Sequence, residues 1–200
     1  MKKTRHWLCA AVPSTAAFFS LCLLLNAAWI PVKAGVAQWL IERSWDKTRN
    51  GDPDARPWPW ADTRAEAVLL VPGQNVRQVV LAGNSGRNLA FGPVLTAGTE
   101  NGPDLIISGH RDTHFRFLRQ LRPGDLIRLD TRESSRWFEV RYLEVVDSRR
   151  RELVIDPSQE RISLVTCYPF DSLIPGGPLR YVVTAVPANA LSSRPTPSSG

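Results

Sequence analysis

The sequence predicts a mainly β protein: a closed β-barrel of about eight strands with short helices, preceded by an N-terminal transmembrane helix. Two observations support this fold. From about residue 61 onward, short apolar and β-branched segments are separated by Gly- and Pro-rich turns, and no long helical pattern interrupts them. Near the N-terminus, residues 7–32 contain no charged side chain. The chain should therefore divide into a membrane segment and one exported β domain.

Composition limits the possible partners. The chain has 200 residues, a formal net charge of +6 and 43% hydrophobic residues, which suits one domain with a real core and an appendage. The surplus of arginine could serve an anionic partner such as nucleic acid or lipid headgroups. No basic helix, zinc-ligand set or aromatic ribonucleoprotein motif accompanies the charge, so we predict no nucleic-acid partner.

The N-terminal segment predicts a signal anchor. Residues 1–6 are basic and favour a cytoplasmic N-terminus, while residues 7–32 can cross a bilayer core of ~30 Å as a helix. We expect this segment to contact membrane lipid as a single pass, with the rest of the chain exported to the extracytoplasmic side. The alternative is a signal peptide cleaved near Asn26-Ala27-Ala28. The apolar run is longer than a usual signal core, which favours the anchor.

Residues 33–61 are predicted to connect the anchor to the domain. Lys33 to Arg49 has helical spacing of apolar and basic residues, and Asn50-Gly51-Asp52-Pro53 should end the helix. The Pro- and Trp-rich stretch Arg56–Trp60 reads as a stiff linker on the domain edge. At the other end of the chain, residues 188–200 are rich in Ser and Pro and are predicted to be disordered.

The domain itself is predicted to cover residues 62–187. Its expected strands are Ala65–Val71, Val76–Ala82, Leu105–Ser108, Leu126–Leu129, Trp137–Val146, Ile162–Cys167 and Leu179–Val186. The first two strands, joined by Pro72-Gly73, resemble a hairpin. Residues 89–93 suggest a helical turn, and residues 111–122 suggest a short amphipathic helix. Residues 147–160 and 171–178 are expected to be surface loops.

One cysteine is the candidate nucleophile. Cys9 and Cys22 lie in the apolar N-terminal segment, so Cys167 has no disulfide partner within the domain. Taken alone, it could equally be a buried cysteine that packs as a small hydrophobe. However, Pro169 cannot continue a strand, because it lacks an amide donor. The Cys167 thiol should therefore lie at the rim of a sheet, where a substrate could reach it.

A reactive thiol needs a base or a cation, and acyl transfer needs a donor for the oxyanion. His110 follows the strand Leu105–Ser108 and is predicted to act as the acid and base, with His114 either structural or supporting the catalytic residues. Arg180 opens the last strand and could face the same rim, although by itself it would read as a surface arginine. The neighbouring side chains predicted to contact the substrate are Thr166, Tyr168 and Ser108.

Other catalytic motifs fit poorly. His110-Arg111-Asp112 is similar to a kinase catalytic loop, but the glycine-rich loop and the D-F-G motif are missing. His110 and His114 have the spacing of a zinc pair, but Arg111 occupies the place of the required glutamate and no third ligand is evident. Ser85 is not in a nucleophile elbow, because Arg87 replaces the final glycine. We therefore predict no metal and no cofactor.

Taken together, three blocks resemble the sortase family of cysteine transpeptidases. The T-L-x-T-C motif of that family is matched by Ser163-Leu164-Val165-Thr166-Cys167, with serine in place of the first threonine. The histidine block is Ile107–Thr113, and the arginine block is Leu179–Val183. The order and spacing of the three blocks also match. The sequence Cys167-Tyr168-Pro169-Phe170 is most similar to class GN sortases of Gram-negative bacteria.

The resemblance implies a sortase-type barrel and a defined reaction. Cys167 would attack a C-terminal sorting signal similar to Leu-Pro-x-Thr-Gly on an exported protein and form a thioacyl enzyme. His110 would transfer protons, Arg180 would hold the substrate carbonyl or the oxyanion, and an amine acceptor at the cell surface would receive the protein. Two alternatives remain: an exported cysteine peptidase that hydrolyses the same signal, and a non-catalytic β domain that binds a surface protein.

Overall fold

The computed structural model of the chain describes residues 3–83, 85–172 and 176–188. The predicted disordered tail therefore lies, apart from its first residue, outside the described residues. The chain forms two compact units, Met1–Trp39 and Leu40–Gly200.

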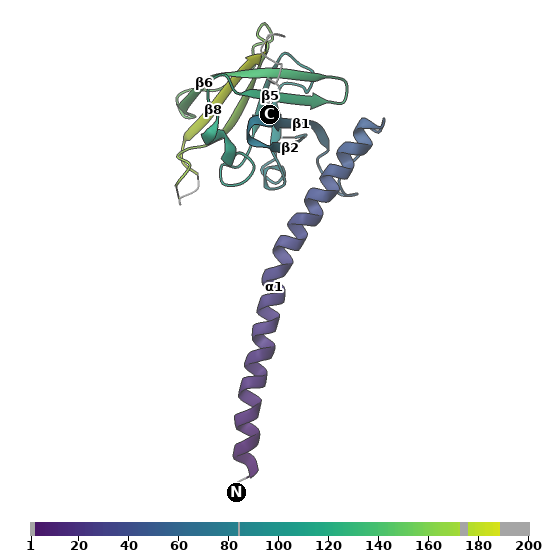
Figure 1. The fold of residues 1–200 in the computed structure, drawn as a ribbon, viewed down its shortest axis with the longest axis vertical. Helices are drawn as coiled ribbons and strands as arrows, with labels where there is room; N and C mark the ends of the chain where they lie inside the picture. The colour runs from purple at the N-terminus through teal and green to yellow at the C-terminus, as the bar shows by residue number, and fades with distance from the viewer. Residues whose placement is uncertain (1–2, 84, 173–175, 189–200) are drawn as a thin grey trace, which may run out of the picture. The chain divides into compact units, whose positions relative to one another are not determined.

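The N-terminal part is a single long helix. Helix α1 (Lys3–Arg49) runs without a break through the position near residue 33 where a separate juxtamembrane helix was expected to begin (Figure 1). It ends at Arg49, as the sequence Asn50–Pro53 predicted. Within the described part of the chain, we find no helical segment with both the length and the apolar character that a membrane crossing requires.

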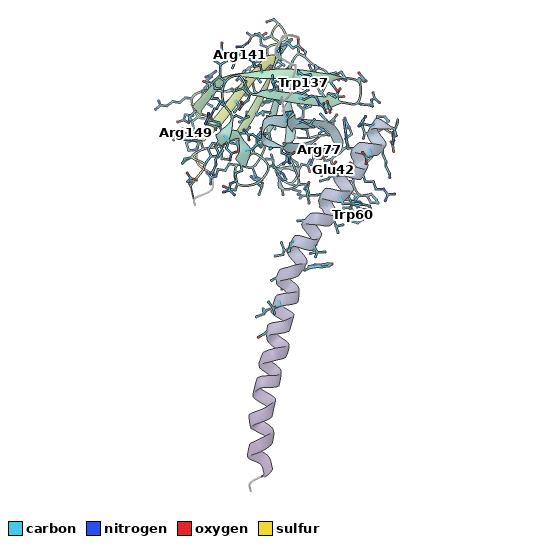
Figure 2. All side chains as sticks on the ribbon, in the orientation of Figure 1. Glu42, Trp60, Arg77, Trp137, Arg141 and Arg149 are labelled. Carbon is cyan, nitrogen blue, oxygen red and sulfur yellow. The ribbon has the colours of Figure 1, made fainter. Side chains whose placement is uncertain are left out.

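The last turns of α1 belong to the same compact unit as the barrel. Ile41 and Trp45 are buried and form one hydrophobic cluster with apolar residues of strands β1 (Ala65–Val71) and β2 (Val76–Leu81). Glu42 forms an ion pair with Arg77 of β2, and both side chains are labelled in Figure 2. The compact unit therefore starts before residue 62, at the C-terminal end of the helix.

The described residues of this unit form a closed barrel of eight strands in the order β1-β2-β3-β4-β7-β8-β6-β5. This confirms the predicted mainly β fold. Besides β1 and β2, the strands are β3 (Val94–Ala97), β4 (Asp104–Ser108), β5 (Leu126–Thr131), β6 (Ser135–Asp147), β7 (Arg161–Cys167) and β8 (Leu179–Pro187). Strands β1 and β2 form the predicted antiparallel hairpin. Three short 3-10 helices complete the described elements: η1 (Pro72–Gln74), η2 (Asn88–Ala90) and η3 (Arg116–Gln120).

The structure differs from the prediction at two places in this unit: one strand was missed, and one helix is shorter than expected. Strand β3 was not predicted, because a four-residue strand carries too little periodicity to stand out from a loop. The predicted amphipathic helix over residues 111–122 is only η3, preceded by turns. The apolar residues Phe115 and Leu118 are buried as expected, but the backbone bonds are those of turns and a 3-10 helix, such as the bond from the Leu118 amide to the Phe115 carbonyl at 3.1 Å.

The alternation of side chains along the strands decides where the site can lie. The barrel interior contains Leu105 and Ile107 of β4, together with Ile162 and Leu164 of β7. The intervening residues face outward and form a second apolar cluster of Ile106, Val146, Val165 and Val182, covered by Leu153 and Ile155. Because successive side chains point to opposite faces, Cys167 continues the outward row that contains Val165.

Candidate active site

The strand order brings the three predicted catalytic residues to one edge of the barrel. Strands β4 and β7 are parallel neighbours, with Ser108 paired to Val165. Strands β7 and β8 are antiparallel neighbours, and Cys167 is paired directly with Arg180. Because neighbouring parallel strands end at the same edge, His110 follows β4 beside the end of β7. The segment of His110 therefore meets the more distant ends of β7 and β8 at this edge.

Cys167 is the last residue of β7, as the sequence predicted. It is a free cysteine and is partly exposed. Its neighbour Thr166 is 3% exposed and donates its hydroxyl to the carbonyl of Gly109 at 2.7 Å. The Thr166 hydroxyl thus ties β7 to the residue that precedes His110, and it is not presented to a substrate in this structure.

His110 is exposed at the end of β4, and the backbone before it is fixed. The amide of Gly109 donates to the carbonyl of Val165 at 3.1 Å. A Cβ atom on Gly109 would lie 2.7 Å from the buried ring of Phe115, so only glycine fits here without displacing that ring. This close contact, together with the Thr166 hydrogen bond, fixes the start of the turn that carries His110.

His114 is held against β2. Its Nδ1 is 3.2 Å from Oε1 of Gln78 on β2, and its ring is partly buried. Burial lowers the pKa of His114, a hydrogen bond with the Ala90 backbone opposes this shift, and the nearby His110 adds to it. Because the two rings interact electrostatically, His114 is a neighbour of the candidate acid and base.

Arg180 is held by the backbone that leads into β8. Its Nη1 donates to the carbonyls of Gly177 at 2.6 Å and of Leu179 at 2.9 Å. These bonds restrain the guanidinium on the strand position opposite Cys167. A restrained planar cation at this position can act as a fixed donor toward an oxygen at the same edge.

An aromatic cluster flanks the candidate nucleophile. Tyr168 stacks on Tyr181 with ring centroids 6.2 Å apart, and Phe170 packs against Tyr181 at 5.1 Å. Burial, and to a lesser extent Tyr168, raises the pKa of the Tyr181 hydroxyl, so this hydroxyl stays neutral at ordinary pH. Tyr168, predicted to contact the substrate, is thus part of an apolar wall directly after Cys167.

Ser108, the third predicted substrate contact, lies on the outward face of β4. Its hydroxyl is 3.1 Å from the hydroxyl of Thr96 on β3. The structure therefore pairs Ser108 across the barrel surface, two residues before His110.

A cavity of about 920 Å³ lies on the same outward face, further along the strands. Its lining includes Ile106, Ser163 and Thr184 on the barrel and residues 151–154 of the segment between β6 and β7. Cys167 and Arg180 do not line it. Ser163 precedes Cys167 by four residues, which places the two about 13 Å apart along the strand. Val165 lies between them on this face and is buried in the cluster that Leu153 and Ile155 cover, so the cavity and the sulfur are separate along the strand.

Two charged side chains that the sequence did not single out are buried among the described residues, Asp104 and Arg111. Asp104 accepts hydrogen bonds from the amide of Asp156 at 2.7 Å and from Nη2 of Arg161 at 2.9 Å, which hold the β6–β7 segment against the barrel. Arg111 binds the segment after Cys167. The only sequence signal for Arg111 was its position next to His110.

Within the described ranges, no group of three His, Cys, Asp or Glu side chains is placed to hold a metal ion.

The barrel is similar to known proteins in sequence and in fold. A profile of the sortase domain family matches residues 69–188. Sortase D of Bacillus subtilis (strain 168) is 30% identical over 125 residues, which is 60% of this chain; the match spans 62% of that relative's length.

Solved structures of sortases share the fold. A sortase D5 transpeptidase of Clostridium perfringens superposes with a TM-score of 0.61 at 20% identity, covering 78% of this chain and 99% of that one. A sortase C of Clostridium perfringens, solved with the C-terminal cell wall sorting motif, gives a TM-score of 0.56 at 18% identity, covering 78% of this chain and 90% of that one. With the family profile covering most of the barrel, the chain belongs to the sortase family.

Proposed function

We propose that this sortase is a cysteine transpeptidase that cleaves a C-terminal sorting signal and transfers the exported protein to an amine acceptor. The observation that carries the proposal is the meeting of His110, Cys167 and Arg180 at one edge of the barrel. These residues supply the three parts that acyl transfer through a thiol requires: a nucleophile, a proton carrier and an oxyanion donor.

In the proposed first half-reaction, the Cys167 thiolate attacks the scissile carbonyl carbon. A C–S bond forms while the carbonyl electrons move onto oxygen, and Arg180 donates N–H groups to this oxyanion. The intermediate then collapses, the C–N bond breaks, and the leaving nitrogen takes a proton from His110. The products are a thioacyl enzyme and the released C-terminal fragment.

In the second half-reaction, an acceptor amine attacks the thioester carbon. His110 accepts a proton from the attacking nitrogen, a C–N bond forms, and the Cys167 thiolate leaves. Water in place of the amine would give hydrolysis. The outcome therefore depends on which nucleophile reaches the thioester, and the same three residues serve both reactions.

We further propose that the signal is similar to Leu-Pro-x-Thr-Gly and binds on the outward face of β4 and β7. The sortase C solved with a sorting motif supports a peptide substrate of this kind. On this face, Ser108 and Cys167 are both partly exposed at the ends of β4 and β7, where the residues beside the scissile bond would bind.

Residues 7–32 remain our proposed membrane anchor, with the barrel on the periplasmic side. Recovery of the protein in the detergent-soluble membrane fraction, with residue 1 intact, would support the anchor; a mature N-terminus near Trp29 would contradict it.

The products of a model substrate test the function. A peptide carrying the proposed signal is incubated with the protein, with and without an amine, and the products are weighed by mass spectrometry. We expect an amide product only in the presence of the amine, and no cleavage by Cys167→Ala. Hydrolysed peptide under both conditions would support a peptidase instead. No cleavage together with an inert Cys167 would support a non-catalytic binding domain.

A further inference from the structure

Arg111 connects the two segments that carry His110 and Cys167. Its side chain is 8% exposed although it carries a full charge. Nη1 donates to the carbonyl of Pro169 at 2.8 Å, and Nη2 donates to the carbonyl of Ser172 at 2.6 Å. Both carbonyls belong to the segment that directly follows Cys167. One guanidinium thus fixes two points of that segment to the turn that contains His110.

A second link lies on the other side of the two reactive residues. The hydroxyl of Thr166 donates to the carbonyl of Gly109 at 2.7 Å. The residues before His110 and Cys167 are therefore bonded to each other, and so are the residues after them. His110 and Cys167 each lie between two cross-links, which restricts how far the two segments can separate.

The contacts of Arg111 indicate that it holds the backbone in place rather than forming a simple ion pair. Its carboxylate partner Asp112, 3.3 Å from Nε, is 69% exposed and so offers little compensation for burying a charge. The two short bonds go to neutral carbonyls instead. Such an arrangement suits the planar fork of arginine, because its two terminal nitrogens present N–H donors in a fixed plane, whereas lysine has a single donor nitrogen on a flexible stem. Burying a cation also contributes less to the stability of a fold than apolar packing in the same place, because the charge loses its hydration.

We propose that Arg111 is a positioning residue that sets the distance and orientation of His110 relative to Cys167. The proposal rests on the transpeptidase reaction above. Arg111 does not touch the reacting atoms; it acts through the backbone of residues 169–172. Because a displacement of about 1 Å at a catalytic pair can cost about a hundredfold in rate, loosening this link should lower turnover.

The test compares Arg111→Lys with a matched control, Arg136→Lys. Arg136 lies on β6 and also donates through both terminal nitrogens to two backbone carbonyls, Gly102 and Glu100, each at 2.7 Å. Those carbonyls are in the turn before β4, at the opposite end of that strand from His110. The two substitutions remove the same kind of contact, so they differ mainly in location.

For Arg111→Lys, we expect kcat of peptide cleavage to fall by about 10- to 100-fold while KM stays within about twofold. Arg136→Lys should keep both values within about twofold of the wild type. Thermal unfolding is measured for both variants, and Arg111→Gln provides a second test if the lysine variant does not fold. Unchanged kcat in a folded Arg111 variant, or an equal loss in the Arg136 variant, would overturn the proposal.

Alkylation of Cys167 by iodoacetamide separates this inference from the proposed function, because it needs no peptide. If the wild type cleaves no sorting peptide, the transpeptidase proposal fails, and the alkylation rate then decides the role of Arg111. A rate lowered by about tenfold in Arg111→Lys but not in Arg136→Lys supports positioning, since a misplaced His110 assists the thiolate less. Equal rates in both variants and the wild type overturn it.

Discussion

At the scale of single residues, the candidate site depends on contacts that admit no alternative side chain. Gly109 is the strongest case, because the ring of Phe115 occupies the space where a Cβ atom would stand. The motif Gly109-His110 thus has a steric origin: the turn that presents His110 approaches the barrel core too closely for any larger residue. The sequence indicated His110 by its chemistry, whereas the contact with Phe115 became visible only in the folded chain.

Gly109→Ala should destabilise the barrel and impair the site. Insertion of a methyl group against the buried Phe115 ring should lower the free energy of unfolding by about 1–3 kcal/mol. The matched control is Gly73→Ala, where nothing lies within 4 Å of the added Cβ. Urea denaturation of the two variants measures the difference. Equal stability of the two would show that the turn yields easily, contrary to our description of this contact.

His114 gives the stability a pH dependence with a defined sign. Burial lowers the pKa of His114 in the folded chain below its ordinary value of 6.5. The unfolded chain therefore binds the proton more readily, so acidification through the region below pH 6.5 favours unfolding. Between pH 7 and pH 5.5, we expect the free energy of unfolding to fall more in the wild type than in His114→Gln. A larger fall in His114→Gln would contradict the assigned direction of the shift.

At the scale of elements, runs of apolar and β-branched residues identified the strands, whereas pairing could be predicted only for the hairpin of β1 and β2. The sequence predicted β7 and β8 because β-branched and apolar residues dominate them, and the structure confirms both strands. It could not predict that β4 lies beside β7, since parallel pairing of distant strands depends on tertiary packing rather than on local pattern. The predicted helix after His110 failed for a related reason: Arg111 and Phe115 make tertiary contacts that a helical pattern does not encode.

The end of α1 is predicted to be an integral part of the domain. Trp45 is 2% exposed against β1 and β2, whereas Trp60 in the following segment is 82% exposed and is labelled in Figure 2. Trp45→Ala should therefore lower the free energy of unfolding by about 3–5 kcal/mol, and Trp60→Ala by less than about 0.5 kcal/mol. Chemical denaturation followed by circular dichroism compares them. Similar small effects would mean that the helix end does not stabilise the barrel.

At the scale of the whole molecule, the barrel converts sequence distance into proximity. His110 and Cys167 are 57 positions apart, yet Thr166 and Gly109 share a hydrogen bond. The sequence predicted the fold class and the three candidate residues, because the motifs carry recognisable chemistry. It did not predict the links made by Arg111 and Asp104, since a buried charge bound to distant backbone looks like any other arginine or aspartate in a sequence. The class GN assignment and the membrane anchor stay predictions.

The central claim is that Cys167 forms a covalent acyl intermediate at the edge it shares with His110 and Arg180. The most direct measurement is the intact mass of the protein after brief mixing with a sorting-signal peptide and an acid quench. We predict a mass increase equal to the acyl portion of the peptide, located on Cys167 by fragmentation and absent from Cys167→Ala. Cleavage of the peptide without any adduct on Cys167, or an adduct that persists in Cys167→Ala, would contradict the account.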